Sequence, residues 1–140
     1  MTLNDNKRRV PLCISTVGDA ELAAVSDVLK SGWLAHGKKN AEFEEAFCEL
    51  IKVRHAVSLN SCTSGIQLGL EAMGVTGEVI VPSFSFVATA NAVVTAGATP
   101  VFADIDPETR CISPDSIEAL VSPQTEAIIP VHYSGLPADM

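Results

Sequence analysis

The strongest constraint on the fold is a regular alternation of short apolar segments with segments of helical periodicity. Short apolar runs are found at residues 55–59, 79–81, 100–103 and 127–131. Between them, apolar residues recur at helical spacing over residues 64–73, 84–96 and 113–121. Strands that are apolar on both faces and alternate with helices are typical of a parallel sheet covered by helices. The sequence therefore predicts an α/β fold with a mostly parallel sheet flanked by helices.

Two further helices are expected before this alternation. Residues 19–30 carry an apolar face and are followed by Gly32, which commonly ends a helix. A second helix is expected to begin with Asn40 as its N-terminal cap, because apolar residues such as Phe43 and Phe47 recur at helical spacing after it. Its other face is acidic and is interpreted as a solvated surface; the residues are Glu42, Glu44, Glu45 and Glu49.

Length and charge limit the function classes. A chain of 140 residues is one domain's worth, and 47% apolar residues argue against disorder. The net charge of −8 and the lack of a basic stripe argue against a nucleic-acid partner. No linker or repeat divides the chain, so residues 1–140 are expected to form a single domain. Nothing after Val131 reads as a closing helix, so this domain is expected to be incomplete.

A cytoplasmic location without a membrane span is expected. Residues 79–103 carry no charge, but Pro82 and Pro100 fit a strand, a helix and a second strand better than one spanning helix. Residues 1–9 are polar and lack the apolar core of a signal peptide. The four cysteines are widely spaced, which suggests free thiols and no metal site.

The stretch Asn60-Ser61-Cys62-Thr63-Ser64-Gly65 lies between an expected strand and an expected helix. A turn of this kind directs free backbone N–H groups and the positive end of a helix dipole at one point. Hydroxyl groups would add further donors, which would make a phosphate-binding cup. The alternative is that these small polar residues only cap the helix.

Six segments, in order along the chain, resemble the DegT/StrS family of pyridoxal-phosphate (PLP) enzymes, which are mostly aminotransferases acting on nucleotide-linked keto-sugars. The segments are residues 31–34 (Ser-Gly-Trp-Leu), 43–44 (Phe-Glu), 60–64, 81–91, 97–107 and 129–135. The resemblance covers roughly residues 10 to 140. It implies that the chain is the N-terminal part of the large domain of a fold-type-I PLP-dependent transferase.

The resemblance also implies site residues. Cys62, Thr63 and Ser64 match the turn that binds the cofactor phosphate, and Phe86 matches the aromatic ring against the cofactor. The pattern alone favours a core residue at a helix start for Phe86, and the resemblance favours the cofactor contact instead. Trp33 opens a loop that the family places near the substrate and the subunit interface. Trp33 and Leu34 are therefore candidate substrate contacts, although Ala35 and the residues after it depart from the family pattern.

Other parts of the family's site have no counterpart here. The family's ring-nitrogen acid follows the point that matches residues 138–140, and its Schiff-base lysine comes later still. The chain has five lysines, the last at Lys52, so no catalytic residue is assigned and the chain alone is expected to be inactive. Asp104 and Asp106 are interpreted as turn residues. His36 is expected to be an exposed loop residue, and His132 is expected to organise a strand end.

The expected parent activity is PLP-dependent amino transfer to a nucleotide-linked keto-sugar, in the biosynthesis of cell-surface polysaccharides or secondary metabolites. Because the family forms dimers, self-association is expected. Nucleotide-sugar and amino-donor substrates are expected only for a complete enzyme. The alternative is a non-catalytic role, as an oligomeric module or a module that binds a phosphate ligand.

Overall fold

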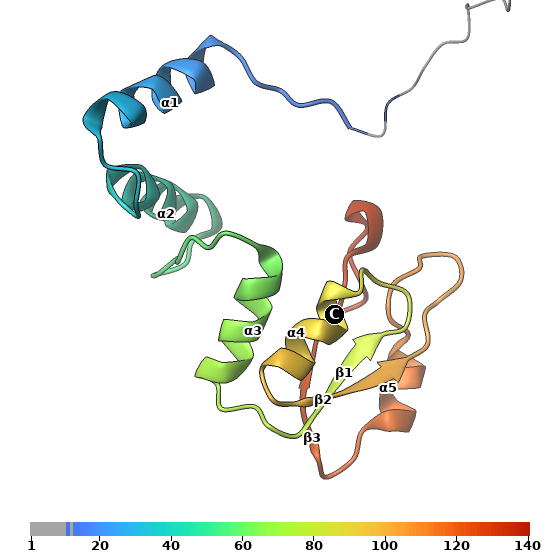
Figure 1. Cartoon of the computed structure of the whole chain (residues 1–140). Helices are drawn as coiled ribbons and strands as arrows, with labels where there is room; N and C mark the ends of the chain where they lie inside the picture. Colours follow the sequence, from blue (N-terminus) through green and yellow to red (C-terminus); the bar gives the residue numbers. More distant parts are fainter. Residues whose placement is uncertain (1–10, 12) are drawn as a thin grey trace, which may run out of the picture. The chain divides into compact units, whose positions relative to one another are not determined.

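The computed structural model describes residue 11 and residues 13–140, so the prediction made for residues 1–9 lies outside the described part. The chain divides into two compact units at the Ser58–Leu59 bond. The first unit contains helices α1 (Asp19–Ser31) and α2 (Lys38–Ile51). The second contains a three-stranded sheet with its helices (Figure 1).

Both helices of the first unit begin after a glycine, and the end of α1 follows the prediction. Gly32 adopts a φ of 71°, and its N–H donates to the carbonyl of Leu29 at 3.2 Å. The prediction that Asn40 caps α2 is wrong by three residues, because Gly37 holds the cap position. From the third helical position, the Asn40 side-chain oxygen accepts the N–H of Gly37 at 3.2 Å. The asparagine therefore satisfies the cap from inside the helix.

The strand predicted at residues 55–59 is wrong. These residues are irregular, and the side chain of Val57 is exposed. A strand forms only against a neighbour that pairs with its backbone, and in the described part of the chain no strand pairs with this segment. The N–H of Ser58 instead donates to the carboxylate of Glu44 at 2.7 Å.

The sheet of the second unit is entirely parallel, as the sequence predicts. Its order is β2-β1-β3, with β1 in the centre; the strands are β1 (Glu78–Pro82), β2 (Thr99–Ala103) and β3 (Thr125–Ile128). The strand expected at residues 127–131 starts two residues earlier and ends sooner than predicted. Ile129 still donates to the carbonyl of Ile80 at 2.9 Å, but Pro130 has no N–H with which to continue the ladder.

Helices cover both faces of this sheet. They are α3 (Cys62–Ala72), α4 (Ala88–Thr95) and α5 (Pro114–Leu120), followed by a short 3₁₀ turn, η1 (Tyr133–Gly135). The chain moves from β1 outward to β2 and then back across β1 to β3. Because parallel crossovers are right-handed, this reversal places α4 and α5 on opposite faces. None of the helices in the described residues is long and apolar enough to cross a bilayer.

The core has two halves, separated by the central strand. Val79 and Val81 of β1 point to one side and pack with Leu70 of α3 and Val93 of α4. Ile80 points to the other side, where α5 contributes Ile117 and Leu120. The other members of this second cluster are Cys111, Ile112 and Ala138. All three β1 side chains are fully buried, which explains why this strand is apolar at consecutive positions.

Candidate functional site

Several elements of the second unit begin or end at the carboxyl edge of the sheet, which is the edge at which its parallel strands end. Helix α3 precedes β1 through a short connection, so it runs antiparallel to β1 and its N-terminus lies at the carboxyl edge (Figure 1). Residues 83–87 leave β1 at the same edge and lead into the N-terminus of α4, which packs against α3. In open parallel sheets, ligands bind at this edge.

The first turn of α3 is capped by one residue and open at the next two. Ser61 is extended, and its hydroxyl accepts the N–H of Ser64 at 3.1 Å. Its hydroxyl also lies 2.9 Å from that of Ser64. Within the described residues, the amides of Cys62 and Thr63 and the Thr63 hydroxyl make no hydrogen bond. The cap is therefore Ser61, and the donors of the next two residues are free for an anion.

Phe86 is exposed and lies outside any helix. The helix predicted to begin at residue 84 begins at Ala88, so residues 83–87 form a bend before it. Two aromatic rings of this bend differ in their surroundings. Phe84 contacts Tyr133, with ring centroids 5.0 Å apart, whereas 78% of Phe86 is exposed. A core position for Phe86 is therefore wrong in this unit, and its ring is available to a planar ligand.

The segment after β3 is held by His132, as the sequence predicts. Its Nδ1 accepts the N–H of Ala138 at 3.0 Å, which closes a loop around η1. Asp106 is a turn residue, also as predicted: its carboxylate accepts the N–H groups of Glu108 at 2.9 Å and Thr109 at 2.8 Å. These bonds, chiefly that from Thr109, hold the pKa of Asp106 below its usual value.

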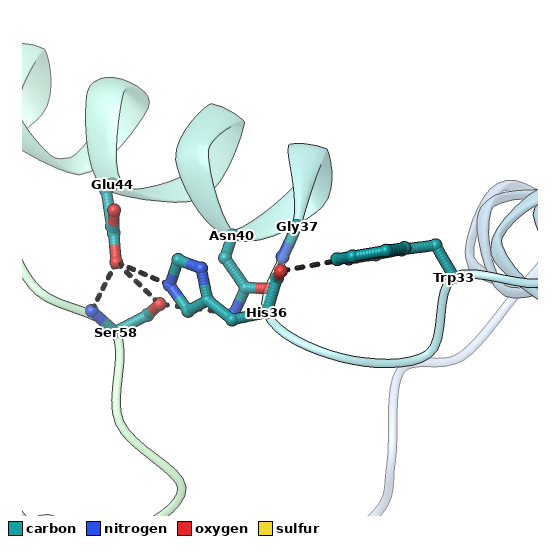
Figure 2. Close-up of polar contacts among 6 residues, drawn as sticks. All are labelled: Trp33, His36, Gly37, Asn40, Glu44 and Ser58. Atoms are coloured by element: carbon teal, nitrogen blue, oxygen red, sulfur yellow. Dashed lines mark hydrogen bonds and ion pairs between the residues drawn. The ribbon is translucent and has the colours of Figure 1, made fainter.

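In the first unit, the loop between α1 and α2 presents the two predicted substrate residues. Trp33 is 65% exposed and Leu34 is 70% exposed. The indole N–H of Trp33 donates to the carbonyl of His36 at 3.0 Å, as Figure 2 shows. His36 is exposed, as predicted, but its ring is not without contact: Nε2 lies 3.4 Å from a carboxylate oxygen of Glu44.

Glu44 is the residue that the sequence interpretation missed. It was assigned to a solvated acidic face, but its side chain is only 22% exposed. One carboxylate oxygen accepts both the N–H and the hydroxyl of Ser58, each at 2.7 Å (Figure 2). These bonds, with His36 contributing less, keep the pKa of Glu44 below its usual value. Its four-residue spacing from Asn40, which also contacts Ser58 at 3.2 Å, was the signal that the two residues share a face.

Known structures resemble this chain over most of its length. DesV from S. venezuelae, solved in complex with a ketimine intermediate, is 38% identical with a TM-score of 0.80, over 84% of this chain and 32% of that one. NtdA from Bacillus subtilis, with bound cofactor PMP, is 38% identical with a TM-score of 0.80, over 84% and 28%. DesI, in the presence of its TDP-sugar product, is 46% identical with a TM-score of 0.75, over 84% and 30%.

The present chain thus spans about a third of the length of these aminotransferase structures. The fold seen here is the one that they share: a parallel sheet flanked by helices, as in fold-type-I PLP enzymes. A family model matches residues 15–140. Sequence motifs, fold and family match agree, and the chain belongs to the DegT/DnrJ/EryC1/StrS aminotransferase family.

Proposed function

We propose that this chain is the N-terminal part of the large domain of a PLP-dependent sugar aminotransferase. The activity of that enzyme is transfer of an amino group to the keto carbon of a nucleotide-linked sugar. The observation that carries the proposal is the open N-terminus of α3, which lies at the carboxyl edge of the sheet, together with the exposed ring of Phe86 in the loop that follows β1 at the same edge. PLP requires both a phosphate anchor and a face for its ring.

The phosphate of the cofactor is assigned to the first turn of α3. The free amides of Cys62 and Thr63 would donate to it, together with the hydroxyls of Thr63 and Ser64. Each donor contributes about 0.5–1 kcal/mol net. Four donors of this strength correspond to a dissociation constant in the millimolar range or weaker. The chain alone is therefore expected to bind phosphate compounds weakly.

The other assignments concern the cofactor ring and the substrate. Phe86 is assigned to the face of the pyridine ring, because its own ring is exposed and follows the strand end directly. When bound, the cofactor supplies an electron-withdrawing ring for amino-group chemistry. Trp33 and Leu34 are assigned to the substrate, because both are exposed apolar side chains in a loop that matches the family's substrate loop.

No residue of the chain is assigned to bind the cofactor covalently, since no lysine follows Lys52. We therefore expect the 140 residues alone to bind ligand without catalysing amino transfer. An amino-transfer assay with PLP, glutamate and a thymidine diphosphate keto-sugar tests this directly. Turnover that survives purification to homogeneity would contradict it.

The binding assignment is tested with pyridoxine 5'-phosphate, which has the ring and phosphate of PLP but no aldehyde to react with surface lysines. Amide chemical shifts of isotope-labelled protein are followed during the titration. Shifts centred on Cys62, Thr63 and Ser64 are expected. Inorganic phosphate is the control probe, and it should shift the same amides without affecting Phe86. Shifts confined to other parts of the chain would refute the assignment.

Self-association is a second proposal, favoured by the apolar faces that both units leave exposed. Helices α1 and α2 alone expose several large apolar side chains: Leu22, Val25, Leu29, Phe43, Leu50 and Ile51. Such surfaces commonly mark interfaces between proteins. Light scattering at increasing protein concentration is expected to show dimers or larger species. A monomer at every concentration would refute the proposal and weaken the alternative role as an oligomeric module.

A further inference from the structure

The side chain of Trp33 is exposed to solvent, but contacts with neighbouring residues hold its ring. Its indole N–H is bonded to the carbonyl of His36, and its ring lies against the backbone of Gly37. A Cβ at Gly37 would approach the ring to 2.8 Å at Cδ1 and 2.9 Å at Nε1, distances that real Cβ atoms do not show. The absence of a Cβ at Gly37 therefore permits this orientation of the ring, and the hydrogen bond from the indole to His36 restrains the ring there.

A network of four polar side chains connects the loop that carries Trp33 to α2. Its members are His36, Asn40, Glu44 and Ser58 (Figure 2). The Glu44 oxygen that accepts from Ser58 also contacts Nε2 of His36 at 3.4 Å. Asn40 contacts the other end of the loop, accepting the N–H of Gly37 at 3.2 Å. All four residues, and the loop itself, belong to the first unit.

From this network we infer that Glu44 is a positioning residue for Trp33. The single carboxylate oxygen holds His36, and the His36 backbone carbonyl in turn holds the indole. Bonds to a carboxylate are stronger than those to a neutral acceptor, and the side chain of Glu44 is only 22% exposed, whereas that of His36 is 62% exposed. Holding a contact residue in its bound orientation lowers the entropy cost of binding.

The consequence for substrate binding rests on the proposed function, in which Trp33 contacts the sugar nucleotide. The restraint itself does not rest on it and can be measured without any ligand. A flexible Trp33 in the unmodified chain would refute the inference and leave the aminotransferase assignment intact. A rigid Trp33 whose resonance ignores thymidine diphosphate would support the inference and count against Trp33 as a substrate contact.

The measurement uses the fact that Trp33 is the only tryptophan, so its indole N–H gives one resonance in a nitrogen–proton spectrum. We expect the order parameter of this N–H to be about 0.85 in the unmodified chain, and to fall below about 0.6 in Glu44→Ala. The matched control is Glu45→Ala, one residue further along α2 and exposed, which should leave the order parameter unchanged. Glu44→Gln, which keeps an acceptor oxygen, should restore part of the rigidity.

A second variant separates positioning from general stability. His36→Ala removes the ring that links Glu44 to the loop but leaves Glu44 and its bonds to Ser58 in place. Because the His36 side chain is mostly exposed, α2 should keep its helical circular dichroism. The indole should nevertheless become mobile, as in Glu44→Ala. A rigid indole in His36→Ala, with α2 intact, would overturn the inference.

Discussion

Ser61 and Thr63 of the α3 turn should respond in opposite ways to substitution, because Ser61 caps the helix and Thr63 would donate to the phosphate in the proposed site. Ser61 accepts the N–H of Ser64 at 3.1 Å, so Ser61→Ala removes the cap. Loss of a serine cap costs about 1 kcal/mol of folding free energy, within a range of about 0.5–2. The Thr63 hydroxyl makes no hydrogen bond within the described residues, and valine matches threonine closely in volume.

Thr63→Val should therefore leave the ligand-free stability nearly unchanged and weaken phosphate binding. The lost hydroxyl donor is worth about 0.5–1 kcal/mol net, as for the other donors of this turn. At about 1.4 kcal/mol for each tenfold change, this is a loss of roughly two- to fivefold in affinity. Urea unfolding without ligand measures the first effect, and a titration with inorganic phosphate followed by amide shifts measures the second.

The reasoning fails if the pattern is reversed. A Thr63→Val variant that is about 1 kcal/mol less stable, yet binds phosphate as the unmodified chain does, would show that Thr63 is a structural residue of the cap. Ser61→Ala serves as the matched control, since its loss of stability shows that the unfolding assay can detect a change of this size.

Three further predictions concern the second unit. Phe86→Ala should change stability little, because the ring is 78% exposed, and should lower affinity for pyridoxine 5'-phosphate to that for inorganic phosphate; equal loss for both probes would contradict stacking. Glu126 accepts the N–H groups of Gly77 and Thr76, chiefly that of Gly77, which holds its pKa below the ordinary glutamate value. A carboxylate whose pKa is lower in the folded than in the unfolded chain stabilises the fold at pH values above its unfolded pKa, and this contribution is lost as the pH falls through its folded pKa. Glu126→Gln should therefore be less stable than the unmodified chain at neutral pH and should lose less stability in acid. Parallel pH profiles from urea unfolding would contradict this. Ile80→Ala, at a fully buried position of the central strand, should cost about 2–5 kcal/mol in urea unfolding, and a cost below about 1 kcal/mol would place Ile80 outside the core.

Local sequence patterns predicted the elements whose backbone hydrogen bonds or burial do not depend on a particular distant partner. A helix closes its hydrogen bonds within its own sequence, so α1 follows its apolar spacing and ends at Gly32. The central strand β1 was recognisable because it is apolar at consecutive positions, and a strand with that pattern must be buried on both faces. The order of motifs along the chain was sufficient to identify the family.

Pairing and burial depend on partners far away in the chain, and the tertiary structure alone determined them. Residues 55–59 carry a strand pattern, yet no strand in the described part of the chain pairs with them, and Ser58 bonds to Glu44 instead. Phe84 and Phe86 look alike in sequence, but among the residues that the structure describes only Phe84 has an aromatic partner, Tyr133. From the sequence pattern Glu44 is a surface residue, but in the structure its carboxylate contacts His36 of the loop and Ser58. Hydrogen-bond partners and contacts of this kind are set by the path of the backbone, which local residue patterns do not specify.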